Sequence, residues 1–314
     1  MRVLITGGAG FIGSHLVRGC LEAGDAVRIL DDFSTGLREN LFGLEADVEL
    51  IEGSLVDFDT VLRASVDREV ILHHAALGSV PLSVEDPLRT HAVNATGTLH
   101  VLEAARRAGV SRVVYAGSCS AYGDAEELPK LETMPPWPRS PYALQKLAGE
   151  GYCEQFTELY GLETIVLRYF NIYGPRQTAS STYAAVIPLF ASAVLDGKRP
   201  TIFGDGLQSR DFTFVSDVVA ANRAAIAATS EAAGEVYNVG CGRRTTLREL
   251  MDEVVRAAGV DGIEPDYQPP RPGDVRHSQA DISKAARLLD WTPRVGLAEG
   301  IAATVEHLAG ERVR

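Results

Sequence analysis

Short apolar runs alternate with longer stretches of helical periodicity along the first half of the chain. Six runs rich in Val, Ile and Leu are predicted as strands, and several are apolar at almost every position, which is typical of parallel strands covered on both faces. This alternation requires right-handed crossovers and therefore predicts an α/β fold with a doubly wound parallel sheet. The predicted strands are residues 2–6, 26–30, 48–51, 69–74, 112–116 and 164–170, and the predicted helices between them include 11–23, 88–107 and 141–160.

The pattern becomes less regular after about residue 170, where loops with Pro and Gly separate shorter elements. Helices are predicted there near 186–197 and 246–258. We therefore expect residues 1–170 to form the sheet domain, with a later contribution from about 212–240. Residues 171–314 are expected to form mainly a smaller C-terminal α/β lobe over the carboxyl ends of the strands, where ligands bind in open α/β sheets.

The composition is that of an ordinary globular protein, with 46% hydrophobic and 23% charged residues in a chain of 314. The formal net charge of −12 argues against nucleic acid or an anionic membrane as a partner, because both would repel the chain. Neither a membrane span nor a signal peptide is expected, since no long apolar run occurs and the N-terminus passes directly into a strand pattern. Scattered cysteines, without the spacing of a zinc site, indicate reduced thiols in a cytoplasmic protein and no metal. They are Cys20, Cys119, Cys153 and Cys241.

A glycine-rich turn follows the first predicted strand. In "ITGGAGFIGSHL", Gly7 and Gly10 permit a tight turn and close approach of a pyrophosphate, and Gly13 permits close helix–strand packing. Asp31 ends the second strand, eighteen residues beyond Gly13, near the spacing of an acid that binds the adenosine ribose. The alternative to a binding role is that these glycines form a purely structural turn that binds no ligand. The combination instead predicts a Rossmann-type dinucleotide site, and the carboxylate favours NAD because it would repel the 2′-phosphate of NADP.

A second motif combines a tyrosine, a lysine and a hydroxyl group. "SPYALQK" opens a predicted helix and places Tyr142 and Lys146 four residues apart, on one face. A tyrosine is a poor base at neutral pH unless a nearby cation lowers its pKa. Taken alone, this spacing is common by chance and fits a ring that packs across a lysine stem. "YAGSCSAYG" adds Ser118 at the carboxyl end of the fifth strand, within reach of a bound substrate.

Further stretches along the chain extend these motifs: "HHAALGSVPLSVEDP", "RYFNIYGPRQ", "YAAVIP", "GDGLQSRDFTFVSDV" and "RPGDVRHSQAD". Together they resemble the extended short-chain dehydrogenase/reductase superfamily and its NAD-dependent nucleotide-sugar epimerases and dehydratases. The resemblance covers essentially the whole chain, and its closest likeness is to bacterial UDP-N-acetylglucosamine 4-epimerases that also accept the uronic-acid form.

The resemblance implies NAD as a bound cofactor and gives each catalytic residue a role. Tyr142 would remove the proton of the sugar 4-hydroxyl, with Ser118 hydrogen-bonded to the same oxygen. Lys146 would hold the nicotinamide ribose and depress the pKa of Tyr142. Hydride would pass from C4 to NAD⁺ and return to the other face of a 4-keto sugar. The implied cofactor contacts are Gly7, Gly10, Phe11, Ile12, Gly13, Asp31, Ser34, Leu55, Ala75, Ala76, Asn94, Tyr142, Lys146 and Tyr169.

The resemblance also implies a UDP-sugar as the substrate. Arg210 and Arg271 would bind its pyrophosphate, because planar guanidinium groups suit phosphate oxygens. The family carries serine where Cys119 stands, and we interpret this thiol as a small pocket wall, not a nucleophile. Ser278 would lie beside the C2 substituent, where a small residue leaves room for an N-acetyl group. The implied substrate contacts are Gly78, Ser79, Ser118, Cys119, Asn171, Gln177, Ala185, Val186, Arg210, Phe212, Arg271, Asp274 and Ser278.

The expected activity is 4-epimerisation of UDP-GlcNAc and UDP-GalNAc, with UDP-glucose and UDP-galactose as further candidates. A UDP-glucuronate (or UDP-N-acetylglucosaminuronate) 4-epimerase is an alternative, because Arg176 could meet a sugar carboxylate. A 4,6-dehydratase is disfavoured, since Cys119 and Ser120 stand where it needs an acidic pair. A non-catalytic NAD-binding sensor would be expected to lack one of the catalytic residues. The family further implies a homodimer through a four-helix interface built by the helices near 88–107 and 141–160.

Overall fold

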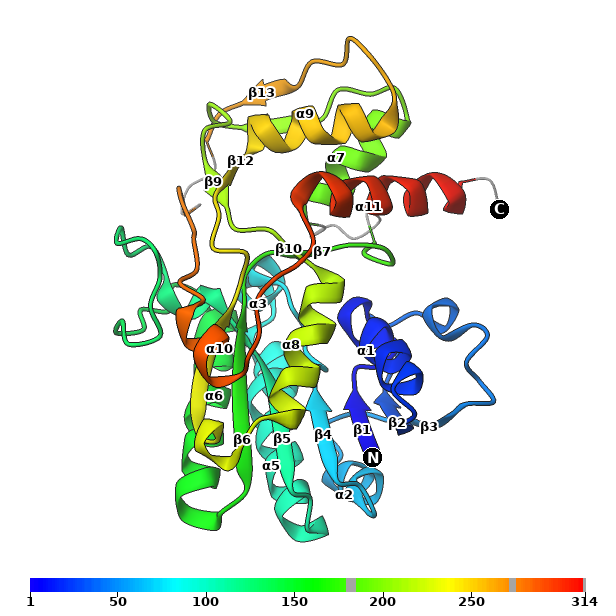
Figure 1. The fold of residues 1–314 in the computed structure, drawn as a ribbon, viewed down its shortest axis with the longest axis vertical. Coiled ribbons are helices and arrows are strands. Elements are labelled where there is room, and N and C mark those ends of the chain that lie inside the picture. Colours follow the sequence, from blue (N-terminus) through cyan, green and yellow to red (C-terminus); the bar gives the residue numbers. More distant parts are fainter. Residues whose placement is uncertain (179–184, 271–274, 313–314) are drawn as a thin grey trace.

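A seven-stranded sheet lies at the centre of the larger lobe, and every neighbouring pair of strands in it is parallel (Figure 1). The computed structural model describes residues 1–178, 185–270 and 275–312. The strand order β11-β6-β5-β4-β1-β2-β3 reverses direction at β1 and β4, which confirms the predicted doubly wound α/β fold. The strands are β1 (Arg2–Thr6), β2 (Ala26–Asp31), β3 (Val48–Glu52), β4 (Val70–His73), β5 (Arg112–Ser118), β6 (Glu163–Tyr169) and β11 (Glu235–Val239).

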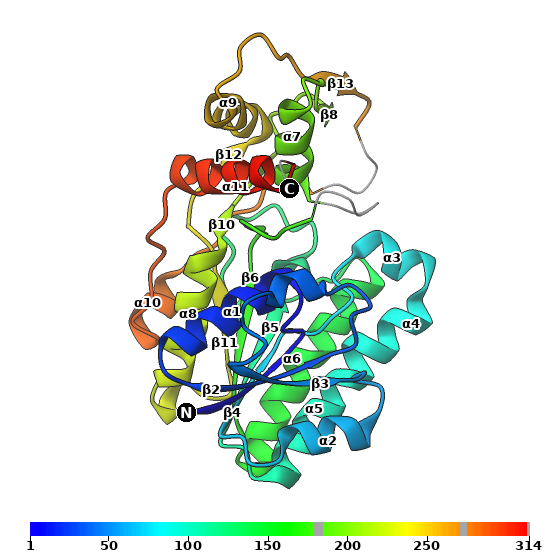
Figure 2. The same ribbon diagram turned by 90° about the vertical axis from the view of Figure 1, so that its right-hand side faces the viewer.

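Helices cover both faces of this sheet (Figures 1 and 2). In β1, Val3 and Ile5 pack towards α1 (Phe11–Glu22) and α8 (Val215–Ala227), whereas Leu4 packs towards the opposite face. That face is covered by α2 (Phe58–Ser65), α5 (Gly97–Ala108) and α6 (Pro141–Tyr160). Burial on both sides explains why the central strands are largely apolar, whereas the edge strand β3 is partly exposed.

The predicted helix at 88–107 consists of three consecutive segments. After the short α3 (Val80–Glu85), the helix α4 (Pro87–His91) begins at a proline, with Asp86 as its N-cap. The segment η2 (Ala92–Thr96) widens into a π-helix and continues directly into α5. Such wide turns inside α-helices are frequent at functional sites. Here the wide turn carries Asn94, whose side chain contacts the loop after β4.

The smaller lobe lies beyond the carboxyl ends of the sheet strands (Figure 1). Its core joins three helices, α7 (Val186–Leu195), α9 (Leu247–Ala258) and α11 (Leu297–Glu311), which pack through apolar side chains. Three two-stranded pairs accompany them. These are β7 (Ile172–Tyr173) with β10 (Thr213–Phe214), β8 (Thr201–Phe203) with β13 (Asp266–Gln268), and β9 (Ser209–Arg210) with β12 (Thr245–Thr246). Elsewhere, the described residues form the further short helices η1 (Arg38–Leu41), η3 (Cys119–Tyr122), η4 (Ser230–Ala232) and α10 (Ser283–Leu288).

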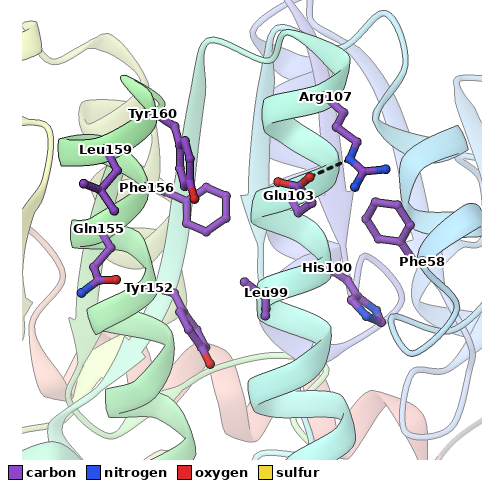
Figure 3. A pocket seen from close by; sticks show the side chains of 10 residues that line it. All are labelled: Phe58, Leu99, His100, Glu103, Arg107, Tyr152, Gln155, Phe156, Leu159 and Tyr160. Carbon is purple, nitrogen blue, oxygen red and sulfur yellow. Dashed lines mark hydrogen bonds and ion pairs between the residues drawn. The ribbon is translucent and has the colours of Figure 1, made fainter.

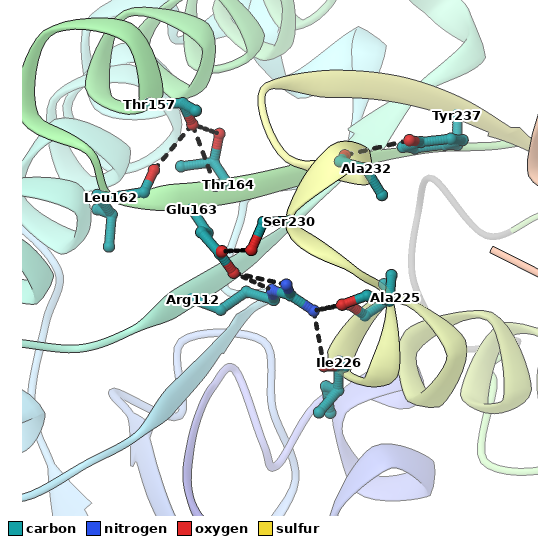
Figure 4. A network of polar contacts seen from close by, with 11 residues as sticks. Arg112, Thr157, Leu162, Glu163, Thr164, Ala225, Ile226, Ser230, Ala232 and Tyr237 are labelled. Carbon is teal, nitrogen blue, oxygen red and sulfur yellow. Dashed lines mark hydrogen bonds and ion pairs between the residues drawn. The ribbon is translucent and has the colours of Figure 1, made fainter. Parts of the chain in front are cut away.

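A buried arginine ties the late helix α8 to the sheet (Figure 4). Arg112, at the start of β5, pairs with Glu163 of β6 at 2.5 Å. Its Nη1 donates to the carbonyl oxygens of Ala225, Ile226 and Ala228, at 2.9, 2.7 and 2.7 Å. The last carbonyls of a helix otherwise have no partner within it. Arg112 therefore anchors the end of α8. No helix within the described ranges is both long and apolar enough to cross a membrane.

Candidate active site

A cleft with a volume of about 660 Å³ lies at the carboxyl ends of the strands, where the strand order reverses. Its walls come from the first turn of α1, the loops after β2, β4 and β5, the first turns of α6, and the segment after β6. Open α/β sheets bind ligands at this place, because helix N-termini and loop backbone converge there. Most of the predicted cofactor and substrate contacts line this cleft.

The glycine-rich turn forms one end of the cleft. Gly7 has φ +72°, in the left-handed region, and a Cβ at Gly13 would lie 1.9 Å from the carbonyl oxygen of Gly7. Only glycine permits this close approach. Gly10 is the N-cap of α1 and has no side chain to cap the first N–H groups, which therefore remain available at the cleft.

Asp31 lies at the end of β2, beside this turn. Its carboxylate accepts hydrogen bonds from Ala9 N at 2.8 Å and Phe33 N at 2.9 Å, one on each oxygen. Burial raises its pKa, while these two hydrogen bonds oppose the rise. Each oxygen keeps a further lone pair for a ribose hydroxyl. Uncapped N–H groups, a glycine cradle and a fixed carboxylate fit the pyrophosphate and ribose of a dinucleotide.

The structure brings nearly all the predicted cofactor contacts to this cleft. Asn94 differs, because it is 1% exposed and does not line the cleft. Its Oδ1 accepts from Leu77 N at 2.8 Å, and its Nδ2 donates to Leu77 O and Gln145 Oε1. Asn94 thus fixes the loop after β4. The predicted contacts that line the cleft are Gly7, Gly10, Phe11, Ile12, Gly13, Asp31, Ser34, Leu55, Ala75, Ala76, Tyr142, Lys146 and Tyr169.

Helix α6 presents Tyr142 and Lys146 to the cleft. Ser140 caps its N-terminus by accepting from Ala143 N at 3.1 Å. One turn beyond Lys146, a Cβ at Gly149 would lie 2.3 Å from the Tyr115 hydroxyl oxygen, so glycine lets α6 pack closely on β5. Lys146 Nζ consequently reaches the sheet and donates to Ala116 O at 3.0 Å.

Ser118 and Tyr142 meet at the floor of the cleft. Ser118 Oγ accepts from Ser120 Oγ at 2.8 Å and from Ser120 N at 3.2 Å. Burial raises the pKa of Tyr142 to about 12, and a hydrogen bond with Ser118 opposes this rise. Burial lowers the pKa of Lys146 to about 8, against the opposing charge of Glu150. In the protein alone, burial of the phenol outweighs the lowering that we expected from Lys146.

Cys119 lines the cleft next to this pair. Burial raises its pKa to about 11, so the thiol keeps its proton near neutral pH and is a poor nucleophile. This agrees with our interpretation of Cys119 as a wall. Ser120 also lines the cleft and donates to Ser118, a role that the motif did not reveal. Among the described residues, no group of three or more His, Cys, Asp or Glu could hold a metal ion.

The predicted substrate contacts divide into two groups. Arg271 and Asp274 lie outside the described residues. Those that line the cleft are Gly78, Ser79, Ser118, Cys119, Asn171, Gln177 and Ala185; those that lie away from it are Val186, Arg210, Phe212 and Ser278.

Asn171 connects the cleft to Ser278. Asn171 Nδ2 donates to Ser278 Oγ at 3.4 Å and to Asp211 O at 3.2 Å. Ser278 is 8% exposed and therefore lies behind the cleft wall. Gln177 Nε2 donates to Ile172 O at 3.1 Å, and its Oε1 is buried with no partner. A buried acceptor without a partner costs free energy, which a hydroxyl donor from a ligand would recover.

Arg210 and Phe212 flank a buried acid. Arg210 Nη1 donates to Ser209 O at 3.0 Å, and Phe212 is 7% exposed, with its ring against Tyr173 in the core of the smaller lobe. Between them lies Asp211.

Asp211 accepts N–H hydrogen bonds from Cys241, Gly242 and Ala280 at 2.7, 3.0 and 3.0 Å. Burial raises its pKa to about 6. Asp211 thereby joins the loop after β11 to the segment that carries Ser278. Sequence reasoning missed this residue, because its partners are distant in the chain.

Residues 3–240 match the model of a protein family described as Epimerase, the NAD dependent epimerase/dehydratase family. The UDP-glucose 4-epimerase of Mycolicibacterium smegmatis is 45% identical over 310 residues, which cover 98% of each chain. The crystal structure of Thermotoga maritima UDP-glucose 4-epimerase with UDP-glucose has 40% identity and a TM-score of 0.94, covering 99% of this chain and 100% of that one. The UDP-N-acetylglucosamine 4-epimerase of Methanobrevibacter ruminantium M1, in complex with UDP-N-acetylmuramic acid, has 37% identity and a TM-score of 0.93, covering 99% and 98%.

Proposed function

This chain belongs to the NAD-dependent epimerase/dehydratase family and is an NAD-dependent enzyme, and we propose that it inverts the 4-hydroxyl group of UDP-sugars. One observation carries the proposal. Tyr142 and Ser118 line the same cleft as the dinucleotide turn, and the Ser118 hydroxyl lies close enough to Tyr142 to oppose the rise in the pKa of the phenol. A sugar hydroxyl between them would meet a base and a hydrogen-bond partner together.

Each residue has a distinct part in this reaction. Tyr142 Oη takes the proton of the 4-hydroxyl as hydride leaves C4, so the sugar becomes a ketone, and the proton returns when hydride is added to the opposite face. Ser118 holds the sugar oxygen throughout. When bound, NAD⁺ supplies the hydride acceptor and a positive ring, which favours the phenolate form of Tyr142. Lys146, whose Nζ donates to Ala116 O in the sheet, would hold the ribose of the cofactor.

For the sugar itself, we propose UDP-GlcNAc and UDP-GalNAc as the leading substrates, with UDP-glucose and UDP-galactose second. The support is the small side chain of Ser278, beside Asn171 of the cleft wall. A tyrosine at position 278 would need the space that an acetamido group could occupy. The relatives include enzymes for both kinds of sugar, a UDP-glucose 4-epimerase and a UDP-N-acetylglucosamine 4-epimerase.

The test is to incubate the purified protein with UDP-GalNAc and to follow UDP-GlcNAc by chromatography. We expect interconversion without added reductant, and a loss of roughly 10² to 10⁴-fold in Tyr142→Phe with NAD still bound. Ser278→Tyr should reduce turnover of UDP-GalNAc much more than that of UDP-galactose. A holoenzyme that interconverts no UDP-sugar contradicts the activity, and equal losses on the two sugars contradict the role of Ser278.

We also propose that two copies pair through α5 and α6. A pocket of about 500 Å³ opens between these helices (Figure 3). Several large apolar side chains on this side of the molecule are exposed: Leu88 84%, Leu144 58%, Leu159 67% and Tyr160 55%. Helix positions 144, 151, 155 and 159 recur at intervals that place them on one face. A second copy would bury these side chains in a four-helix arrangement, as expected for exposed apolar surface.

A further inference from the structure

A short segment after β7 crosses from the smaller lobe onto the first turn of α1. His15 Nε2 donates to Pro175 O at 2.9 Å, and Arg176 Nε donates to Ser14 Oγ at 3.0 Å. Arg176 has φ +66°, in the left-handed region that a residue with a long side chain rarely adopts. The two contacts with α1 hold the segment in this conformation. They also place the Arg176 side chain in the cleft wall with Gly10 and Gly13.

Arg176 brings a positive charge to this end of the cleft. No described carboxylate forms an ion pair with Arg176, and α1 has no acidic residue in its first turn. Arg18 adds a second guanidinium, which donates to Ser14 O and Asn40 O. Burial, and then the charge of Arg18, lowers the pKa of Arg176 to about 10, so it still carries its proton at neutral pH. The chain as a whole has a net charge of −12, but the two guanidinium groups give this region a local positive charge that favours binding of an anion.

We propose that Arg176 binds the diphosphate of the bound dinucleotide, so that a residue of the smaller lobe helps to retain the cofactor. A guanidinium fork binds phosphate oxygens through charge-assisted hydrogen bonds, and the Nη groups of Arg176 have no described protein partner. Its Nε is fixed to the first turn of α1, where a dinucleotide diphosphate lies in this type of fold. Of the candidate residues for the UDP-sugar, Gln177 follows Arg176 in the chain, whereas Asn171 and Arg210 make their hydrogen bonds with other segments.

This assignment makes Arg176 unavailable for a sugar carboxylate and so removes the residue that suggested a uronic-acid substrate. It rests on family membership and on the contacts of Arg176, and it holds whichever sugar is used. A failure of the proposed epimerase activity would therefore leave it untouched.

The experiment compares wild type, Arg176→Gln and Arg18→Gln by equilibrium dialysis against NAD, adenosine and UDP. Adenosine shares the adenine and ribose of NAD but has no phosphate. Arg18 is the matched control, because it is a second guanidinium near Ser14 that does not line the cleft. We expect Arg176→Gln to weaken NAD binding by about tenfold or more and to flatten its salt dependence, as the loss of one charge-assisted contact predicts. Adenosine should bind all three proteins alike, and Arg18→Gln should change NAD affinity by less than about threefold.

Four outcomes would overturn the proposal. Unchanged NAD affinity in Arg176→Gln would show that Arg176 does not contact the diphosphate of NAD. A parallel loss of adenosine binding, or an equal loss in Arg18→Gln, would mean that the effect is structural or a general effect of charge. A loss of UDP affinity with NAD affinity intact would assign the guanidinium to the substrate.

Discussion

Lys146 and Glu150 form a buried pair of opposite charges one helical turn apart on α6. Glu150 is itself held by Arg168, whose Nη2 lies 2.7 Å from Glu150 Oε2 and whose Nε donates to both oxygens at 3.1 Å. Burial lowers the pKa of Lys146 to about 8, and the charge of Glu150 is the main influence that opposes this change. Glu150 therefore helps Lys146 to keep its proton at neutral pH.

We predict that Glu150→Gln shifts the alkaline limb of the pH–activity profile to lower pH. Lys146 carries its proton below its pKa and loses it as the pH rises through that value. Without the negative charge at position 150, the proton is lost earlier, and we expect the limb to move down by roughly one pH unit. The measurement is kcat as a function of pH from 6 to 10. The control is Glu103→Gln, which removes a carboxylate on the neighbouring helix that is remote from Lys146. An unchanged limb in Glu150→Gln would show that Glu150 does not act on Lys146.

Some residues of the candidate active site could be predicted from the sequence, and others could not. Tyr142, Lys146 and Ser118 lie in short motifs whose spacing follows from one helix and one strand end. Asp211 was not predicted, and the hydrogen bonds of the predicted residue Asn94 to Leu77 were not predicted either, because the partners of both lie in other segments. Their roles depend on how segments meet in three dimensions, and a single chain without its fold does not contain that information directly.

Among the elements, the buried strands and α6 were the most predictable. Each of the six predicted strands agrees with the observed one within two residues. For the central strands the reason is burial on both faces, which leaves an apolar run, whereas the edge strand β3 is partly exposed. The π-helical segment at Ala92–Thr96 was not predicted, since it differs from an α-helix in hydrogen bonding and not in composition. The two-residue strands of the smaller lobe are too short for periodicity to reveal.

Arg112 supports a prediction about how these elements are joined. We expect Arg112→Met to lower the free energy of unfolding by about 2 to 4 kcal/mol, because it leaves Glu163 without its ion pair and the end of α8 without hydrogen-bond donors. The measurement is urea unfolding at a fixed NAD concentration. Arg2→Gln is the control, since its ion pair with Glu69 is exposed to solvent and should contribute little to stability. Similar losses in both variants would mean that the network of Figure 4 adds no special stability.

At the scale of the whole molecule, the exposed apolar side chains of α4 and α6 predict the state of assembly. We expect wild type to sediment as a dimer and Leu159→Glu to shift it towards the monomer at micromolar concentration, because the substitution would bury a charge in the interface. Leu207→Glu changes an exposed leucine of the smaller lobe and should leave the mass unchanged. A monomeric wild type at all concentrations would contradict the proposed pairing.

Strand β11 has a further consequence for how the chain is made. It pairs with β6, yet the whole of β7 to β10 and two long helices are synthesised between the two. Until Val239 has left the ribosome, β6 is the unpaired border of an incomplete sheet, with backbone N–H and C=O groups open to other chains. A nascent chain or a fragment that ends near residue 170 would therefore expose an unpaired strand edge that can aggregate with other chains. Its tendency to aggregate depends on how quickly β11 is synthesised and pairs with β6.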